Sequence, residues 1–509
     1  MSKITDIMQN LIMSNPKRAI WFMTSMKPDF WEKQGENLAL KTFHEAAEKV
    51  PAYKDFISKH GIKDHTKIKT IDDFKKYVPL MDKDNYLRAY PLEKLVIGKI
   101  EESYTLYMSG GTTGDPTYYL VPREEFKVLP FGMVAIYDYL WDITSKKTLF
   151  INGMALGVWM AGVIANFLLK TLCDKYKNFT VVTPGADYER ILDILEKIGR
   201  NYDLIFIGCY PTLLKTLLDT GKQRGIDWKK YNIKVNMGGE PFDDNLRDYI
   251  LNKINPTTEG FWAISEGYGG TEFGYPGLAT PLTIEIRKIA RRNEELCLEI
   301  FKNKIPLGLY QWNPAQQLVE SINDTLYITR GGKIPLIRYT PKDMGNLFSW
   351  EEMNQILVKN KINIFQQLEK DGWVKPNFQW PFMTFLGRKD YSISLYGAKI
   401  SPQMIQYVLG ENPLTHSFKI SGREEKNLKL SFDVFIELQK NVKISEEEKQ
   451  RIEAEYSKKI LDYLLKTNFD FKDAYSIHKE ALTPKVKVYS FREGPFQEEK
   501  DRIKPRFII

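Results

Sequence analysis

A segment of glycines and hydroxyl residues, Tyr107–Tyr118, has the composition of an anion-binding loop. Within its sequence YMSGGTTGDPTY stand Ser109, Gly110, Gly111, Thr112, Thr113 and Gly114. Glycines let backbone N–H groups approach a ligand closely, and hydroxyls can donate to oxygen anions, so such a loop can wrap a polyphosphate. It is not a Walker loop, because no Gly-Lys-Ser/Thr follows at the required spacing. Taken alone, a segment of this composition is more often an ordinary turn.

Four later segments change this interpretation because they occur in a fixed order. They are NMGGEPF (236–242), YGGTEFG (268–274), LIRYTPKD (336–343) and FLGRKDYSISLYGAKISP (385–402). Each one by itself is an ordinary loop or strand end. A series that contains all of them by accident is improbable.

The series resembles the adenylate-forming enzymes, a superfamily of acyl-CoA synthetases, peptide-synthetase adenylation domains and luciferases. It is most similar to the phenylacetate-coenzyme A ligase branch, in which GGEP, YGxTE and IRYxxxD are typical. The runs VPAYKDF and IDDFKKYVPLMDKDNY near the N-terminus are similar to that branch as well. The resemblance implies that a carboxylate attacks the α-phosphate of ATP, pyrophosphate leaves, and the thiol of coenzyme A displaces AMP. The first step depends on neutralised phosphates and a positioned nucleophile.

The resemblance implies a set of phosphate-binding residues. The loop Ser109–Gly114 would hold the β- and γ-phosphates, and Thr271 would contact the α-phosphate. Glu272 would ligate Mg²⁺, a hard cation that prefers carboxylate and phosphate oxygens. A lysine near the chain end completes adenylation in this superfamily. Here the tail FQEEKDRIKPRFII lacks the usual preceding glycine, and it offers Lys500, slightly favoured, or Lys504.

The resemblance also implies a nucleoside site and a hinge. The adenine would be lined by Tyr268, Gly269, Gly239, Glu240 and Pro241. Asp343 would accept hydrogen bonds from the ribose hydroxyls, with Arg388 near the same sugar. Without the series, Asp343 would be interpreted as an exposed loop carboxylate. Asp390 matches the hinge about which the small domain rotates between the two steps, and Gly397 would bring bare backbone against the pantetheine arm of coenzyme A.

One departure from the pattern concerns the phosphate loop. The loop commonly ends Gly-Lys-Pro, whereas this chain has Gly114-Asp115-Pro116. An acidic side chain near a polyphosphate is unfavourable unless it points to solvent or helps to hold the metal. Two alternatives therefore stand beside the coenzyme A ligase: an adenylating enzyme with a carrier-protein, amine or cofactor acceptor, and a catalytically silent nucleotide-binding homologue.

The walls of an acyl pocket could come from four aromatic residues in or near the motif-bearing region: Trp159, Tyr210, Phe261 and Tyr275.

The order of apolar patterns predicts a mixed α/β fold. Between 101 and 388, β-rich runs such as DLIFIGC alternate with helical patterns such as YERILDILEKIGRN, which indicates βαβ units and a buried, largely parallel sheet. Residues 1–100 are mostly helical in pattern. We expect a large N-terminal domain of mostly parallel sheets and helices, made of a helical layer (1–100) and an AMP-binding body (101–388).

The pattern changes after Arg388, and residues 389–509 are predicted to form a small mobile α+β lid domain. Apolar residues alternate over 428–438, as expected for a strand with one wet face. Ser445 with Glu448 is a capping-box signature at the start of a long amphipathic helix.

Composition excludes several classes of protein. The 509 residues include 43% apolar and 27% charged residues, which is typical of a globular protein with a large core. The net charge of +8 is scattered, so we expect no nucleic-acid partner. Three cysteines without a CxxC pair indicate a reducing, cytoplasmic location. Residues 1–18 predict an amphipathic helix, and the most apolar stretch (148–172) is interrupted by asparagines, so we expect no stable membrane insertion. The expected partner is a small carboxylic acid, and homodimers are common in the resembled branch.

Overall fold

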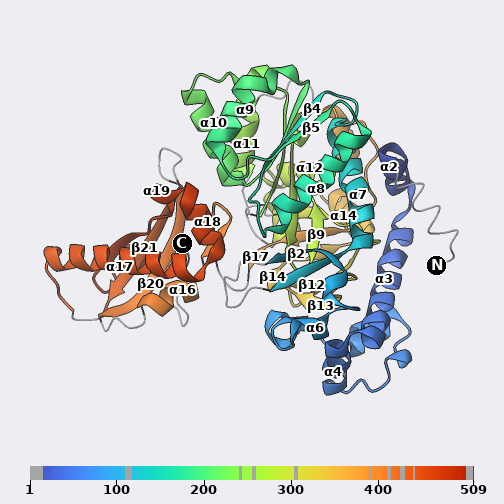
Figure 1. Ribbon diagram of the computed structural model, residues 1–509, viewed down its shortest axis with the longest axis horizontal. Helices are drawn as coiled ribbons and strands as arrows, with labels where there is room; N and C mark the ends of the chain where they lie inside the picture. Colours follow the sequence, from blue (N-terminus) through green and yellow to red (C-terminus); the bar gives the residue numbers. More distant parts are fainter. Residues whose placement is uncertain are drawn as a thin grey trace. The chain divides into compact units, whose positions relative to one another are not determined.

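The computed structural model describes residues 15–108, 117–239, 244–254, 260–302, 306, 308–388, 392–400, 402–409, 414–424, 430–439, 442–499 and 508. The chain forms two compact units: the described residues up to Gly387 belong to the first, and those from Arg388 onward belong to the second (Figure 1). The amphipathic pattern before Asn15 lies outside the described residues. Among the described helices, none is both long enough and apolar enough to cross a bilayer.

A nine-stranded sheet forms the centre of the first unit. Its strand order is β15-β16-β10-β9-β8-β7-β6-β4-β5. The bounds are β4 Thr148–Gly153, β5 Phe179–Val182, β6 Leu204–Cys209, β7 Ile233–Gly238, β8 Ile264–Gly270, β9 Gly274–Leu278, β10 Gly308–Gln311, β15 Leu347–Phe348 and β16 Phe382–Phe385. The five strands from β5 to β8 are parallel, and from β9 onward each neighbour is antiparallel. The mixed α/β fold predicted from the alternation of strands and helices is confirmed.

Helices cover both faces of the parallel strands, and every residue of β4 and β6 is buried (Figure 1). Leu149 and Ile151 of β4 pack toward α9 (Tyr188–Ile198), α10 (Pro211–Gln223) and α11 (Asp244–Ile254). Phe150, between them, packs toward α7 (Arg123–Trp141), α8 (Met160–Lys175) and α12 (Pro281–Ala290). The period-two alternation of side chains thus divides one apolar run between two cores.

A buried carboxylate of α12, one of the helices that cover the central sheet, is expected to make the stability of the first unit depend on pH. Glu285 of α12 is fully buried, and its Oε1 has no hydrogen-bond partner among the described residues. Lys288 of the same helix pairs with Glu285 at 3.3 Å and also with Asp371, which follows α15 (Ile364–Lys370). Burial raises the pKa of Glu285 to about 7, and Asp371 adds to the effect while Lys288 opposes it.

We therefore expect the first unit to lose stability as the pH rises from about 4.5 to about 7, because the folded state keeps a proton on Glu285 that the unfolded state releases. The loss should be about 1–3 kcal/mol. All ten tryptophans precede Gly387, so urea unfolding followed by tryptophan fluorescence reports on this unit. Glu285→Gln should flatten the profile between pH 5 and 8; an unchanged slope in that variant would show that another group is responsible.

A second sheet and the N-terminal helices form another core of the first unit. The strands are β1 (Met81–Asp82), β11 (Leu318–Ile322), β12 (Thr325–Arg330), β13 (Leu336–Thr340), β14 (Asp343–Met344) and β17 (Gly387–Arg388). The helices of this region and of the outer layer are α2 Pro16–Ser25, α3 Pro28–Lys49, α4 Pro51–Lys59, α5 Ile71–Tyr77, α6 Leu92–Leu95, α13 Glu294–Phe301 and α14 Trp350–Lys359. Phe43 and Phe74 are buried between α3, α5 and this sheet. β1 lies parallel to β13, so the chain leaves β1 beside Thr340.

The second unit is a three-stranded sheet packed against helices. Its elements are β18 Ile393–Leu395, β19 Ala398–Ile400, α16 Pro402–Leu409, β20 Thr415–Glu424, β21 Leu430–Leu438, α17 Glu446–Thr467, α18 Phe469–Ile477, α19 Lys479–Leu482 and β22 Lys485–Tyr489. β21 lies between β20 and β22. Ser445 caps α17 by accepting a hydrogen bond from the Glu448 amide at 3.1 Å, as its sequence predicts.

The wet face predicted for residues 428–438 is wrong. Phe435 and Glu437 on that face of β21 are buried. The ring of Phe435 contacts that of Tyr489, and Glu437 accepts a hydrogen bond from the Arg492 amide at 2.7 Å. The end of β22 and the chain that follows it therefore cover the face that the alternating pattern left polar.

Candidate functional site

Glu272 lies in the tight turn between β8 and β9, beside Thr271, and is the centre of a charged cluster. Lys83 forms an ion pair with its Oε1 at 2.6 Å, and the Thr117 hydroxyl donates to the same oxygen at 2.7 Å. Burial raises the pKa of this carboxyl. The charge of the Lys83 ammonium and the hydrogen bonds from side chains and backbone lower it by more, and hold the pKa at about 2. Glu272 is therefore an anion at neutral pH.

Glycines make this turn possible. Gly274 has φ +72°, a left-handed conformation that favours glycine. At Gly269, an added Cβ would lie 2.7 Å from Cδ1 of Tyr275, so a larger residue has no space there. The sequence YGGTEFG therefore folds back on itself within two residues of Glu272, and the carboxylate projects from the end of β8.

Strand pairing joins the two described ends of the glycine-rich segment, and one of these ends lies at this turn. β2 (Ser103–Met108) and β3 (Tyr118–Pro122) are antiparallel, and Met108 lies opposite Tyr118. The ends of the intervening segment are thereby held together, and Thr117, its next described residue, contacts Glu272. The segment itself, Ser109–Pro116, lies outside the described residues.

Tyr268 and Asp343 form a second contact between motifs that are distant in sequence. The Tyr268 hydroxyl donates to Oδ2 of Asp343 at 2.7 Å, and both side chains are buried. The tyrosine ring packs against Tyr310 and Phe385, with ring centroids 5.9 and 5.3 Å apart. Asp343 begins β14 and is not the exposed loop carboxylate that its sequence alone would favour.

The glycine pair of the NMGGEPF motif lies at the end of β7. Gly239 has φ +82°, and an added Cβ would lie 2.9 Å from Cε1 of Tyr210. Its neighbour Gly238 pairs with Gly267 of β8, so this turn leaves the sheet next to the strand that carries Tyr268. The carboxyl ends of adjacent parallel strands are the usual place for ligand binding in such sheets.

Several residues named from the sequence lie outside the described part of the chain: Ser109, Gly110, Gly111, Thr112, Thr113, Gly114, Asp115, Glu240, Pro241, Asp390, Lys500 and Lys504. Arg388 lies in β17, at the junction of the two units. Gly397 has φ +85° and occupies the tight turn between β18 and β19, where Leu395 pairs with Ala398.

The acyl-pocket candidates stay predictions. Trp159 precedes α8, and Tyr210 accepts a hydrogen bond from the Ala155 amide at 3.4 Å. Phe261 lies under the Lys288 ammonium, 5.2 Å from its ring centroid. Tyr275 is 44% exposed and packs against the backbone of Gly269, which makes it the member nearest to the turn of Glu272.

Sequence reasoning missed two cations near the turn. Lys83 lies within the run IDDFKKYVPLMDKDNY, which is part of the resemblance but assigns the lysine no role, and the cap residues Asp82 and Asn85 around it signal a fixed position. Arg330 donates to the Tyr119 hydroxyl at 2.7 Å, and its guanidinium lies 5.3 Å from the centroid of that ring. Its Nη1 also lies where a side chain at Gly274 would be.

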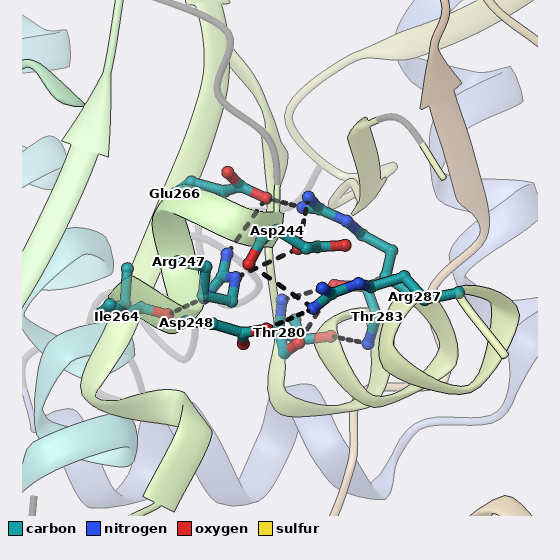
Figure 2. A network of polar contacts seen from close by, with 9 residues as sticks. Asp244, Arg247, Asp248, Ile264, Glu266, Thr280, Thr283 and Arg287 are labelled. Carbon is teal, nitrogen blue, oxygen red and sulfur yellow. Dashed lines mark hydrogen bonds and ion pairs between the residues drawn. The ribbon is translucent and has the colours of Figure 1, made fainter. Parts of the chain in front are cut away.

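A buried network of two arginines and two carboxylates supports β8 (Figure 2). Arg287 of α12 pairs with Asp244 of α11 at 2.8 Å and with Glu266 of β8. Arg247 of α11 lies 3.4 Å from Glu266 and donates to the Ile264 carbonyl at 2.8 Å. The network fixes β8 two residues before Tyr268 and ties it to the helices on either side.

The donor set at Glu272 fits a magnesium ion that is held mainly by a nucleotide. Among the described residues, no group of three or more His, Cys, Asp and Glu side chains could hold a metal by itself. Mg²⁺ is usually bound through one or two carboxylates together with substrate phosphates and water. The ionised carboxylate of Glu272, which accepts a hydrogen bond from Thr117, would supply one such oxygen ligand.

Comparisons with known proteins show the fold. No family model and no curated protein sequence matches the chain. The structure is similar to 2-hydroxyisobutyryl-CoA ligase bound to 2-HIB-AMP and CoA in its thioesterification state, with a TM-score of 0.63 at 13% identity over 96% of this chain and 90% of that one. The postadenylation and open forms of that ligase each give a TM-score of 0.54 at 13% identity, over 96% of this chain and 91% or 93% of theirs. The chain therefore shares the fold of 2-hydroxyisobutyryl-CoA ligase.

Proposed function

We propose that this protein is an ATP-dependent acid-thiol ligase that adenylates a carboxylic acid and transfers the acyl group to coenzyme A, releasing pyrophosphate and AMP. The observation that carries the proposal is the hydrogen bond between Tyr268 and Asp343, 2.7 Å long and buried. It joins the YGGTEFG and LIRYTPKD motifs beside the Glu272 turn, in a fold shared with 2-hydroxyisobutyryl-CoA ligase. The finer proposal, from the sequence motifs, is a member of the phenylacetate-coenzyme A ligase branch.

In the first step, the substrate carboxylate attacks the α-phosphorus of ATP. Thr271 donates to the α-phosphate, and the Ser109–Gly114 loop holds the β- and γ-phosphates. Asp343 accepts from the ribose hydroxyls, while the Tyr268 hydroxyl fixes the orientation of that carboxylate. Glu272 is the residue that would hold Mg²⁺, which, when bound, neutralises charge on the phosphates. Glu240 and Pro241, with Gly239 and Gly269, line the adenine.

The second unit contributes to both steps in this proposal. Lys500, or else Lys504, reaches the α-phosphate during adenylation, and Arg388 lies near the ribose. Asp390 is the hinge. A rotation of the second unit about it removes the lysine after adenylation and brings the turn at Gly397 into use for the transfer to coenzyme A. Gly397 itself, in a left-handed conformation, carries no side chain, which suits close passage of the pantetheine arm.

The remaining parts of the proposal concern location and partners. Among the described residues, Cys173, Cys209 and Cys297 form no disulfide, and two of them are buried, which supports the proposed reducing cytoplasmic compartment. The partner is a small-molecule carboxylic acid, and a homodimer is the proposed assembly from the resembled branch.

The test is a product analysis with the full chain. The protein is incubated with ATP, Mg²⁺, coenzyme A and a panel of aryl, arylacetic and fatty acids, and AMP and acyl-CoA are measured by mass spectrometry. One class of acid should give AMP and acyl-CoA in equal amounts. Formation of AMP without a thioester would indicate that the acceptor is not coenzyme A. Absence of AMP with every acid would contradict the proposal.

A further inference from the structure

Lys83 is the described cation that forms an ion pair with Glu272 itself. Its ammonium lies 2.6 Å from Oε1 of Glu272, and its side chain keeps a quarter of its surface exposed. The same oxygen accepts from Thr117, the residue that follows the glycine-rich segment. Lys83 and the residue that ends the candidate phosphate loop therefore meet at one oxygen of the candidate metal ligand.

The position of Lys83 is fixed from both sides. Before it, β1 pairs with β13, and Asp82 lies opposite Thr340. After it, a turn of π-helix, η2 (Lys83–Leu87), is capped by the Asp82 side chain, which accepts from the Asp84 and Asn85 amides at 2.9 and 2.7 Å. The lysine is thus held by strand pairing and capping, and its contact with Glu272 does not depend on a flexible loop.

The chain upstream of β1 is anchored as well. Arg338 of β13 donates to the Lys75 and Val78 carbonyls at 2.7 and 2.8 Å, and it forms a bidentate pair with Glu320 at 3.0 Å. Val78 lies three residues before β1. The arginine of the LIRYTPKD motif therefore contributes to holding the segment that carries Lys83.

The glycine-rich segment itself lacks a cation. Residues 109–116 read SGGTTGDP, with an aspartate and neither lysine nor arginine. A polyphosphate bound there carries several negative charges, and backbone N–H groups supply only partial positive charge. An ammonium at the edge of the segment would remove part of this deficit, and a charge-assisted hydrogen bond to phosphate is stronger than a neutral one.

We propose that Lys83 binds the β- and γ-phosphates of ATP and that Glu272 holds it in place before the nucleotide arrives. This inference rests on the proposed function. In adenylation, a carboxylate oxygen forms a bond to the α-phosphorus, the bond from that phosphorus to the bridging oxygen breaks, and pyrophosphate leaves with the electron pair. The Lys83 ammonium neutralises charge that accumulates on this leaving group, without transfer of its proton.

The test compares the binding of ATP and AMP by titration calorimetry in EDTA, so that neither metal nor acid is required. Lys83→Met should raise the Kd for ATP about tenfold or more and change the Kd for AMP less than about twofold, because AMP lacks the contacted phosphates. Lys83→Arg keeps the charge and should retain most of the ATP affinity. Equal losses for ATP and AMP in Lys83→Met, or no loss for either, would overturn the inference.

Two controls separate this role from a structural one. Lys359→Met removes a lysine from another Lys–Glu pair, to Glu299 at 3.0 Å between α14 and α13, and should leave both affinities unchanged. The double variant Lys83→Met/Glu272→Gln leaves no unpaired charge and should still discriminate poorly between ATP and AMP; wild-type discrimination in it would overturn the inference. If the wild-type protein binds neither nucleotide, the proposed function itself fails, whereas ATP binding that Lys83→Met leaves intact removes only the role of Lys83.

Discussion

Replacing Arg287 by methionine is expected to lower the free energy of unfolding of the first unit by about 3–5 kcal/mol. Arg287 is 1% exposed and pairs with both Asp244 and Glu266 (Figure 2). Methionine fills a similar volume but carries no charge. The buried carboxylates of Asp244 and Glu266 would then have Arg247 as their one remaining cationic partner in this network. Desolvation of an uncompensated charge, more than the lost attraction, gives the effect its size.

Urea unfolding followed by tryptophan fluorescence measures this change, since every tryptophan belongs to the first unit. Lys302→Met is the matched control, because Lys302 pairs with Asp324 at 2.7 Å on the surface, where both side chains are about half exposed. That variant should change stability by less than about 1 kcal/mol. If Arg287→Met costs no more than the control, the network does not support β8 as described.

Replacing Asp343 by alanine is expected to lower kcat/KM for ATP about a hundredfold. Hydrogen bonds to a buried charged group contribute about 1.5–3 kcal/mol each, and the proposed site gives Asp343 two ribose hydroxyls. The carboxylate is 2% exposed and already oriented by Tyr268, so it is in place before the nucleotide binds. The rate of pyrophosphate exchange at limiting ATP measures the change.

A substrate change distinguishes ribose recognition from a folding defect. The wild-type protein should discriminate strongly against 2′,3′-dideoxy-ATP, and Asp343→Ala should use the two nucleotides almost equally. Tyr268→Phe, which removes only the orienting hydrogen bond, should lose less than about tenfold. Equal losses in Tyr268→Phe and Asp343→Ala, with discrimination retained, would mean that Asp343 acts only through Tyr268.

The parallel half of the sheet was predictable because it depends on local pattern. The run TLFING, apolar on both faces, became β4, and the neighbouring helical patterns supply its two covering layers. The antiparallel half was not predictable, since the direction of β9, β10 and β16 depends on pairings between distant segments. The covered face of β21 was missed for the same reason: Tyr489 and Arg492 reach it from beyond α17.

For the site, the motifs indicated which residues matter, but their contacts could not be derived. Tyr268 and Asp343 were assigned to different parts of one nucleotide, and no pattern signals that they touch. Lys83 lies in a run that belongs to the resemblance, but nothing in that run signals its ion pair with Glu272, which depends on the pairing of β1 with β13. The buried arginines of Figure 2 were invisible because charged residues in amphipathic helices usually face solvent.

The most direct measurement of the central claim is acid-dependent exchange of labelled pyrophosphate into ATP by the wild-type protein, with Glu272→Ala beside it. Exchange requires only that a carboxylate reversibly displaces pyrophosphate from ATP, so it tests adenylation without reference to the acceptor. We predict exchange that depends on one class of carboxylic acid and that is absent in Glu272→Ala. Nucleotide binding without exchange for any acid, or exchange that Glu272→Ala leaves intact, would contradict the account.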